Sequence, residues 1–523
     1  MKNQYIRNAN YEISRILTLL DRNKYSETYG SFDRNYWHYK IKDFSSGMSQ
    51  EFTLALALAF TTSYDGNYFQ NPFIKEYVEA GIEFTINSSR KDGSTDDYFP
   101  YERALGAAVF SLYAVTEAYL LLNLNNKIFI DFFRKRAKWI CENEESGKLS
   151  NHHAIAALAL HNVFLISKEE EFKKTAKKKI EQVISWQTDE GWYQEYEGCS
   201  LGYLSVSIDF LAQYFRKTGD SKVLKSLNNA VDFFHKLQHP DGTIGGEYAS
   251  RFTYIFHPNG FEILADKNHK AREIANSYLS AKTKDLIPNI ADDYIIGHAL
   301  ISSLNAYRNC LVRDFNVLNS SNKECSDYFE KSGFYLYKKN NIHAVFNMYK
   351  GGCGKIFKDN KLVYNDAGVI LQTGKQLAVS SMINFDSKIT INEAGFEISK
   401  NFNLYKQQYA KLLIFLAFRS FLFVFGPFDW SSRLLRKFLQ RKMITGKKNL
   451  PIEYHRKVAF TEIGIELITR VKKGNGLKKI ALASDLVPIY TAVSECFQKD
   501  MIKHNWKDFE LINNEYLLEE KIR

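Results

Sequence analysis

Three polar residues at the start of one apolar segment are candidates for chemistry. The stretch "SNHHAIAALAL" places Asn151, His152 and His153 directly before a run with helical spacing. Ser150 or Asn151 would cap this helix, which explains one of the polar residues. The others would gather at a helix N-terminus, where free backbone N–H groups and the helix dipole favour an anion. The segment therefore predicts a site for a negatively charged ligand.

A second group of candidates lies in the aromatic and acidic stretch "WQTDEGWYQEYEGCSLGY" at 186–203. This stretch is too polar for a helix core and too aromatic for an ordinary solvent-exposed loop. It supplies three candidate site residues, Glu195, Tyr196 and Tyr203. A tyrosine can act as acid or base when nearby cations lower its pKa.

The aromatic stretch has a loose echo further along the chain. Gln187 and Gly191 recur as Gln238 and Gly242 in "LQHPDGTIGGEY". Asp-Gly turns that end helices explain the glycines, but not the polar residues that follow. The polar residues lie in "GGEYASRFTYIFHPNGFE". There we expect Glu247 and Arg251 to bind ligand and His257 to be catalytic.

The N-terminal region offers a candidate binding wall in "DRNYWHYKIKDF", which contains Arg34, Trp37, His38, Lys40 and Asp43. Cations, carboxylates and rings in so few residues suit a ligand wall, although a structural ion-pair knot is the alternative. The segment "YFPYER" adds Glu102 and Arg103, which either contact substrate or brace a loop.

The elements that must position these residues follow from the spacing of apolar side chains. Helical spacing continues to about residue 310, and glycines at 93, 147, 191 and 242 recur at steps near fifty residues. Such a step is the length of two helices and their turns. If the helical hairpins close into a ring, every second loop reaches the same face and brings the candidates together.

Past about residue 330 the pattern changes to alternating apolar and polar residues, as in "KIFKDNKLVYND". This alternation predicts the strands of an antiparallel sandwich. Helices followed by strands indicate two domains, which we place at 1–325 and 330–523.

An insertion at about 405–448 interrupts the strand pattern. The apolar run "LLIFLAFRSFLFVFGPF" at 412–428 is followed by a strongly basic segment. It is short for a membrane span and contains Arg419, so an interfacial helix held by anionic lipid fits better. The alternative is an insertion that packs on the two domains. We expect an anionic membrane surface as a partner through 412–448.

Composition narrows the class of protein. The 523 residues carry a net charge of +11, which favours an anionic partner. Nucleic acid is disfavoured because the basic residues concentrate beside the apolar run and not along a stacking groove. The cysteines lack ligand spacing, and no phosphate loop, GxSxG or HExxH motif is present, so we expect no metal and no cofactor. The N-terminus lacks an apolar signal segment, so we expect a cytoplasmic protein, peripheral to the inner face of the cell membrane.

With these residues assembled, the chain resembles the heparinase II/III-like polysaccharide lyases. "SNHHAIAALAL" is similar to the family's Asn-His helix start, and "DEGWYQEYEGCSLGY" to the segment with its catalytic tyrosine. "DRNYWHYK" and "NGFE" resemble a subgroup associated with bacterial surface-polysaccharide gene clusters. The resemblance implies an (α/α) toroid followed by an antiparallel β-sandwich. It also implies that Asn151 neutralises a uronate carboxylate, with His152 or His153 beside it, and that Tyr203 is catalytic.

The chemistry expected from the resemblance is β-elimination in an acidic polysaccharide. Removal of the weakly acidic C5 proton needs a neutralised carboxylate and preorganised donors, for which Asn, His and Arg are suited. A glycoside hydrolase is the alternative, with its two carboxyl groups drawn from Asp43, Glu102, Glu195 and Glu247. A second alternative is a membrane-associated protein that binds or modifies a lipid-linked glycan without degrading it.

Overall fold

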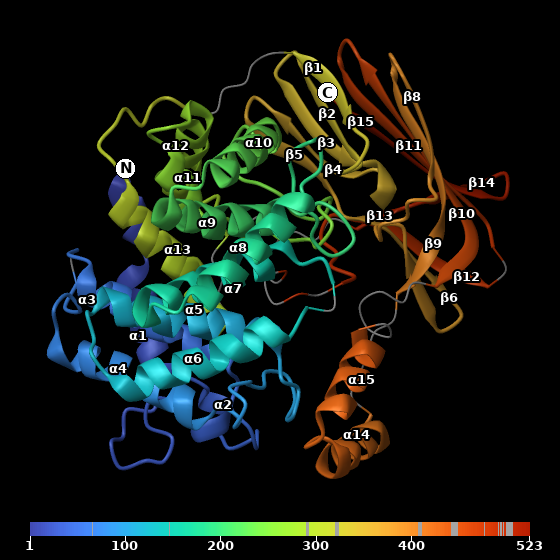
Figure 1. The fold of residues 1–523 in the computed structure, drawn as a ribbon. Helices are drawn as coiled ribbons and strands as arrows, with labels where there is room; N and C mark the ends of the chain where they lie inside the picture. The colour runs from blue at the N-terminus through green and yellow to red at the C-terminus, as the bar shows by residue number, and fades with distance from the viewer. Residues whose placement is uncertain are drawn as a thin grey trace.

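The computed structural model describes the chain except for residues 65, 146, 289–291, 319–323, 406–410, 441–447, 475, 490, 492–493, 495 and 498–505. Figure 1 shows a helical domain beside a β-domain, with a helical hairpin reaching from the β-domain along the helical domain. The basic residues Arg441, Lys442 and Lys447 of the predicted insertion lie outside the described residues.

Within the described residues, six helices form a closed inner ring, in which each helix contacts the next and the last contacts the first. In order they are α3 (Phe52–Thr61), α5 (Leu105–Leu121), α7 (Ser150–Ser167), α9 (Leu201–Thr218), α11 (Asn259–Leu264) and α13 (Ile296–Asn309). Helices α3, α5 and α7 are apolar nearly all round, as expected of helices buried on every side.

A second layer of helices surrounds the ring and alternates with the inner helices along the chain. It comprises α1 (Ala9–Leu19), α4 (Pro72–Asn87), α6 (Lys127–Glu142), α8 (Glu170–Ser185), α10 (Ser221–Leu237) and α12 (His269–Thr283). Helices α6, α8 and α10 are amphipathic, because one face packs on the ring while lysines and glutamates cover the other. The short elements η1 (Lys2–Ile6), α2 (Arg34–Trp37) and η2 (Met48–Glu51) complete the domain. This is the predicted (α/α) toroid.

The repeated glycine turns hold the two layers together. Gly191 and Gly242 adopt positive φ angles of 110° and 89°. A Cβ atom at either position would lie 2.4 Å or less from a backbone carbonyl of the next outer helix, so only glycine fits. Gln187 and Gln238 hydrogen-bond the carbonyls of these glycines and of the same outer helices. The repeat in the sequence is therefore a repeated inter-layer contact.

Because each pair of inner helices is separated by one outer helix, the inner helices run parallel. Their N-terminal ends therefore share one face of the toroid, as the glycine spacing predicted. The polar loops that precede α5, α7, α9, α11 and α13 all reach this face.

The β-domain is a sandwich of two sheets, in which every pairing between described strands is antiparallel. The first sheet contains β1 (Cys325–Phe329), β2 (Phe334–Lys339), β3 (Ile342–Asn347), β4 (Cys353–Lys358) and β5 (Lys361–Asp366). Strand β1 begins before the boundary predicted at 330. Its residues are half-buried or exposed, so their alternation is weak.

The second sheet is ten-stranded, with the order β13-β12-β6-β7-β9-β10-β11-β15-β14 and β8 paired with β9. Its strands are β6 (Gly368–Thr373), β7 (Gln376–Val379), β8 (Lys388–Asn392), β9 (Gly395–Tyr405), β10 (Asn449–Thr461), β11 (Gly464–Lys472), β12 (Leu477–Ala483), β13 (Lys507–Asp508), β14 (Glu510–Ile512) and β15 (Glu515–Ile522). Rings from both sheets meet in the core, where the Phe346 and Phe396 centroids are 5.4 Å apart.

The first sheet also packs against the toroid, through η3 (Met348–Lys350) and β4. Lys350 donates to the carbonyls of Glu247 and Ala249, and Asn347 donates to the Tyr248 carbonyl at 2.8 Å. The loop between α10 and α11 is thereby pinned by the β-domain, which fixes where its polar residues point.

The predicted insertion forms the hairpin α14 (Leu412–Phe425) and α15 (Asp429–Gln440) between β9 and β10. It lies against two loops of the toroid, through an ion pair of Arg419 with Asp43, between α2 and η2, and a ring contact of Phe418 with Phe99, before α5. None of the described helices is both long and apolar enough to cross a membrane.

Candidate active site

The centre of the shared face is built by two loops that bind each other. Ser150 donates to the Gln194 carbonyl at 2.6 Å, and the Asn151 N–H donates to Glu195 Oε2 at 3.3 Å. A backbone bridge joins Leu149 to Glu195 as well. The start of α7 and the loop before α9 therefore act as one unit. Asn151 is buried, and a hydrogen bond between its side chain and the Glu195 carboxyl acts to lower the pKa of Glu195.

Tyr203 lies on the first turn of α9, beside Tyr196 and Arg251. The Tyr196 and Tyr203 ring centroids are 6.1 Å apart, and the Arg251 guanidinium lies 3.9 Å from the Tyr196 ring. Arg251 is fully buried, but its Nε and Nη2 atoms make no hydrogen bond. Burial raises the pKa of Tyr203 to about 12, while a hydrogen bond from Thr491 and the charge of Arg251 act to lower it.

Glu195 connects the two halves of this cluster. Burial raises the pKa of its carboxyl to about 7, although Asn151, His152 and Arg251 all act to lower it. One oxygen, Oε1, makes no hydrogen bond. Asn151, Tyr203 and Arg251 are thus brought together around a buried carboxyl that is close to its titration point at neutral pH.

His152 faces the same region and is paired with Glu145, with 3.0 Å between Nδ1 and the carboxylate. Burial acts to lower the pKa of His152, but the bond and charge of Glu145 outweigh it and raise the pKa. His153 points elsewhere, and its ring packs edge-on against Trp186 at 4.8 Å. Burial lowers the pKa of His153 to about 4.

Two segments of the β-domain also contact the site, and sequence reasoning missed both. They are the loop with Thr491 and Ser494, and helix α15. Ser494 donates to the Arg251 carbonyl at 3.0 Å, and Thr491 hydrogen-bonds both Ser494 and Tyr203. Arg436 of α15 lies near Glu145 and Glu102; burial lowers the pKa of Arg436 and these carboxylates act to raise it. Only the basic character of the insertion hinted at Arg436, and we find no sequence signal for Thr491 or Ser494.

Glu102 and Arg103 form the rim of the site and brace its loop. Glu102 accepts hydrogen bonds from the backbone N–H groups of Asp97 and Tyr98 at 3.1 and 2.7 Å. Burial and Asp97 raise the pKa of Glu102 to about 8. Arg103 donates to Ser432 and to the Pro427 carbonyl, both at 3.1 Å, and so holds the hairpin.

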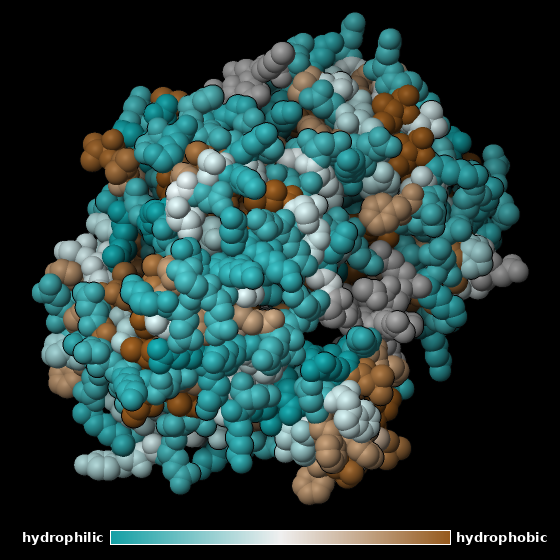
Figure 2. Space-filling view, in the orientation of Figure 1, coloured by the Kyte–Doolittle hydropathy of each residue, from teal (hydrophilic) through white to brown (hydrophobic). Residues whose placement is uncertain are grey.

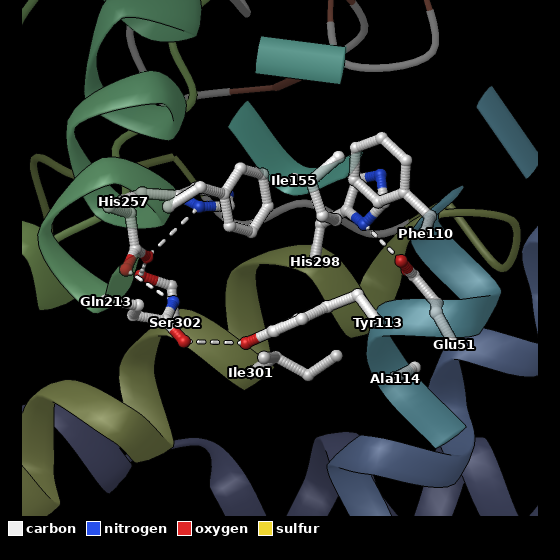
Figure 3. A pocket seen from close by; sticks show the side chains of 12 residues that line it. Glu51, Phe110, Tyr113, Ala114, Ile155, Gln213, His257, His298, Ile301 and Ser302 are labelled. Carbon is white, nitrogen blue, oxygen red and sulfur yellow. Dashed lines mark hydrogen bonds and ion pairs between the residues drawn. The ribbon is translucent and has the colours of Figure 1, made fainter. Parts of the chain in front are cut away.

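His257, predicted for catalysis, lies instead in the wall of a cavity inside the ring (Figure 3). Its Nδ1 is 3.5 Å from the Asp209 carboxylate, and His298 pairs with Glu51 at 2.6 Å at the other end. The cavity measures about 20 Å³, which is room for one water molecule and not for a sugar. His257 lies just before α11, where its backbone N–H donates to the Ser205 hydroxyl of α9 at 3.0 Å.

Glu247, predicted to bind ligand, lies at the interface between the domains. It accepts a hydrogen bond from Tyr254 at 2.5 Å and lies 3.5 Å from the Lys355 ammonium. Lys355 in turn donates to the Tyr254 hydroxyl at 3.0 Å. The carboxylate is therefore occupied by a cation from β4, which sequence spacing could not reveal.

The predicted N-terminal wall folds as a knot of ion pairs and rings. Arg34 pairs with Asp293 at 2.9 Å, and Trp37 donates to the Leu19 carbonyl at 2.8 Å. The His38 ring packs between those of Trp37 and Tyr39, Lys40 is exposed with a φ of 53°, and Asp43 pairs with Arg419. Within the described part of the chain, we find no direct contact from these five predicted residues to Asn151, Tyr203 or Arg251.

No family model matches the chain, and no curated protein matches it in sequence. Solved structures do match. A Paenibacillus xanthan lyase covers 92% of the chain with a TM-score of 0.55 and 11% identity, and the Streptomyces coelicolor A3 chondroitin AC lyase in complex with chondroitin sulphate covers 92% with a TM-score of 0.57 and 9% identity. The chain has the fold of these polysaccharide lyases. It spans 46% of the xanthan lyase chain and 68% of the chondroitin lyase chain.

Proposed function

We propose that the protein is a carbohydrate-active enzyme that cleaves a uronate-containing glycan by β-elimination. One observation carries the proposal: the buried guanidinium of Arg251, which lies beside Tyr203, has two donors, Nε and Nη2, that make no hydrogen bond. A buried donor without a partner costs about 1–3 kcal/mol, so a site that keeps such donors is built for a ligand that supplies the acceptor. A uronate carboxylate is such an acceptor. The fold shared with two polysaccharide lyases supports the same substrate class.

The reaction follows from the chemistry of these groups. Asn151 and Arg251 bind the carboxylate and stabilise the charge that develops on it as the C5–H bond breaks. The Tyr203 oxygen takes the C5 proton, the electron pair forms the C4=C5 double bond, and the C4–O bond to the leaving sugar breaks. The leaving oxygen takes a proton from Tyr203 or from water. His152, paired with Glu145, binds the same carboxylate as a further cation.

The test is to incubate the protein with uronate polymers and follow the absorbance of an unsaturated product. We expect Tyr203→Phe to abolish the product while binding of the polymer is retained. Tyr214→Phe is the matched control, because Tyr214 lies on the same helix about 16 Å away. Product formation by Tyr203→Phe at the normal rate would remove Tyr203 from the mechanism. Binding without product from any uronate polymer would favour a glycan-binding role.

The pKa of Glu195 favours a second candidate, glycoside hydrolysis with Glu195 as the general acid. A carboxyl with a pKa of about 7 remains partly protonated at neutral pH, as that role requires. Of the four carboxyl groups considered for hydrolysis, Asp43 and Glu247 are paired with Arg419 and Lys355, which leaves Glu102. Its pKa of about 8 keeps Glu102 mostly protonated at neutral pH, which disfavours it as the nucleophile or base that hydrolysis needs.

The pH profile separates the two candidates. Because burial raises the pKa of Tyr203 to about 12, little phenolate exists at neutral pH. The rate of elimination should therefore rise by about tenfold per pH unit from pH 7 towards pH 10. Hydrolysis that needs protonated Glu195 should instead slow above pH 7. In addition, Glu195→Gln should leave elimination largely intact but reduce hydrolysis by about 10² or more.

A further inference from the structure

The outer face of the α14–α15 hairpin is apolar and exposed. Its exposed large side chains are Leu412, Leu413, Ile414, Phe415, Leu416, Phe423, Val424, Phe425, Phe428, Trp430, Leu434 and Phe438. Phe423 is the most exposed of them, at 85%, and within α14 only Leu422 is buried. Figure 2 shows this face as a continuous hydrophobic area over the hairpin. Soluble monomers rarely expose apolar patches of this extent unless the patch binds something.

The charges around the patch identify the kind of partner. Residues 405–448 contain ten lysines and arginines and a single acidic residue, Asp429. This segment therefore accounts for most of the net charge of +11. On α15 the cations Arg433 and Lys437 are exposed next to the apolar Leu434 and Phe438. Apolar anchors flanked by cations complement a bilayer surface that contains anionic phospholipid.

The inner face of the hairpin is bound to the toroid through polar and apolar contacts, so the orientation of the patch is specified. Ser432 donates to the Tyr101 carbonyl at 2.7 Å, and Arg436 donates to the Arg103 carbonyl at 3.1 Å. Gly426 lies so close to the Tyr101 ring that a Cβ atom there would be 2.6 Å from it. On α14, Phe418 contacts Phe99 and Leu422 is buried, whereas the large apolar side chains of the patch are exposed to solvent.

We propose that the α14–α15 hairpin docks the protein on a membrane containing anionic phospholipid. The 14 residues of α14 extend about 21 Å, which is shorter than the hydrocarbon core, so the hairpin lies in the interface and does not span it. The leucines and phenylalanines enter the acyl boundary, and the lysines and arginines meet lipid phosphates. Docking of this kind needs no enzymatic activity.

Docking has a consequence for the substrate, which rests on the proposed function. Arg436 reaches from the hairpin to Glu145 and Glu102, so the docked hairpin is an edge of the candidate site. Docking would therefore place the candidate site next to the bilayer surface. The substrate class that fits is an acidic glycan attached to the membrane through a lipid.

The experiment is co-sedimentation of the full-length protein with vesicles made of phosphatidylcholine alone, or of equal parts phosphatidylcholine and phosphatidylglycerol. We expect binding to the mixed vesicles only. Phe423→Glu should weaken it by at least about tenfold, and Lys437→Gln by about fivefold. Ile463→Glu is the matched control, since Ile463 is 66% exposed but lies in the turn between β10 and β11 and should leave binding unchanged.

Three outcomes would overturn the proposal: no binding to the mixed vesicles, equal binding to neutral vesicles, or an equal loss in Ile463→Glu. A concentration-dependent dimer that Phe423→Glu abolishes, without vesicle binding, would assign the patch to a second copy of the chain. Tyr203→Phe should bind vesicles like the wild type. Vesicle binding therefore tests the docking proposal even if the elimination proposal fails.

Discussion

Two fully buried arginines, one in the outer wall of the toroid and one in the candidate site, are held in opposite ways. Arg136 on α6 donates from all three nitrogens, to the Gly93 carbonyl at 2.9 Å, to Ser111 at 2.7 Å and to Ser89 at 2.5 Å. Arg251 is held by the Tyr196 ring and by Ser494 on its own carbonyl, while Nε and Nη2 make no hydrogen bond. The first arrangement stabilises a fold, whereas the second leaves donors open, as the proposed binding of a carboxylate requires.

The largest effect should come from Arg251→Met, which keeps the volume of the side chain and removes its charge. Loss of a preorganised donor to the developing charge should reduce kcat/KM on a uronate polymer by about 10³. The thermal unfolding midpoint should stay the same or rise, because no hydrogen bond from Nε or Nη2 is lost. A large fall in the midpoint would place Arg251 with Arg136 as a structural residue.

Arg136→Met should show the reverse pattern. It leaves the carbonyl of Gly93, the buried Ser111 hydroxyl and the half-buried Ser89 hydroxyl without their donor, so the free energy of unfolding should fall by about 3 kcal/mol. Urea titration measures this loss. Activity per folded molecule should match the wild type. If it fell as far as in Arg251→Met, the two arginines could not be divided into a structural and a ligand-binding residue.

Glu195→Gln tests the cluster through the pH dependence of stability. The pKa of Glu195 is raised by burial from 4.5 to about 7 in the folded protein, so the folded state binds the proton more tightly than the unfolded state. Between pH 4.5 and pH 7, the free energy of unfolding should therefore fall by on the order of 2 kcal/mol more in the wild type than in the variant. Thermal unfolding of both proteins across this range measures the difference. If the stability of the two proteins changed with pH in the same way, the raised pKa of Glu195 would be contradicted.

The smallest effect should come from Arg34→Gln in the N-terminal knot. The pair of Arg34 with Asp293 is partly exposed, so its loss should change the free energy of unfolding by less than about 1 kcal/mol. Activity on a uronate polymer should not change. A strong loss of activity would instead restore the N-terminal segment as a wall of the binding site.

Much of the fold was predictable because it depends on local patterns. The spacing of apolar residues indicated helices and then strands, and the Asp-Gly turns at Gly191 and Gly242 indicated the repeat. From the repeat followed the shared face, on which Asn151 and Tyr203 do lie together. Both stand at the first turn of an inner helix, a position that a sequence pattern can locate.

The remainder was decided by contacts between distant parts of the chain. Lys355 pairs with Glu247, Arg419 pairs with Asp43, and His257 lies in the wall of the small cavity inside the ring. Thr491 and Arg436 enter the site only because the β-domain docks on the toroid. Periodicity is a property of neighbouring residues, so the sequence by itself determined the helices, the strands and the shared face. Which charges are paired and which donors stay open depends on how whole domains pack, and only the tertiary structure decided that.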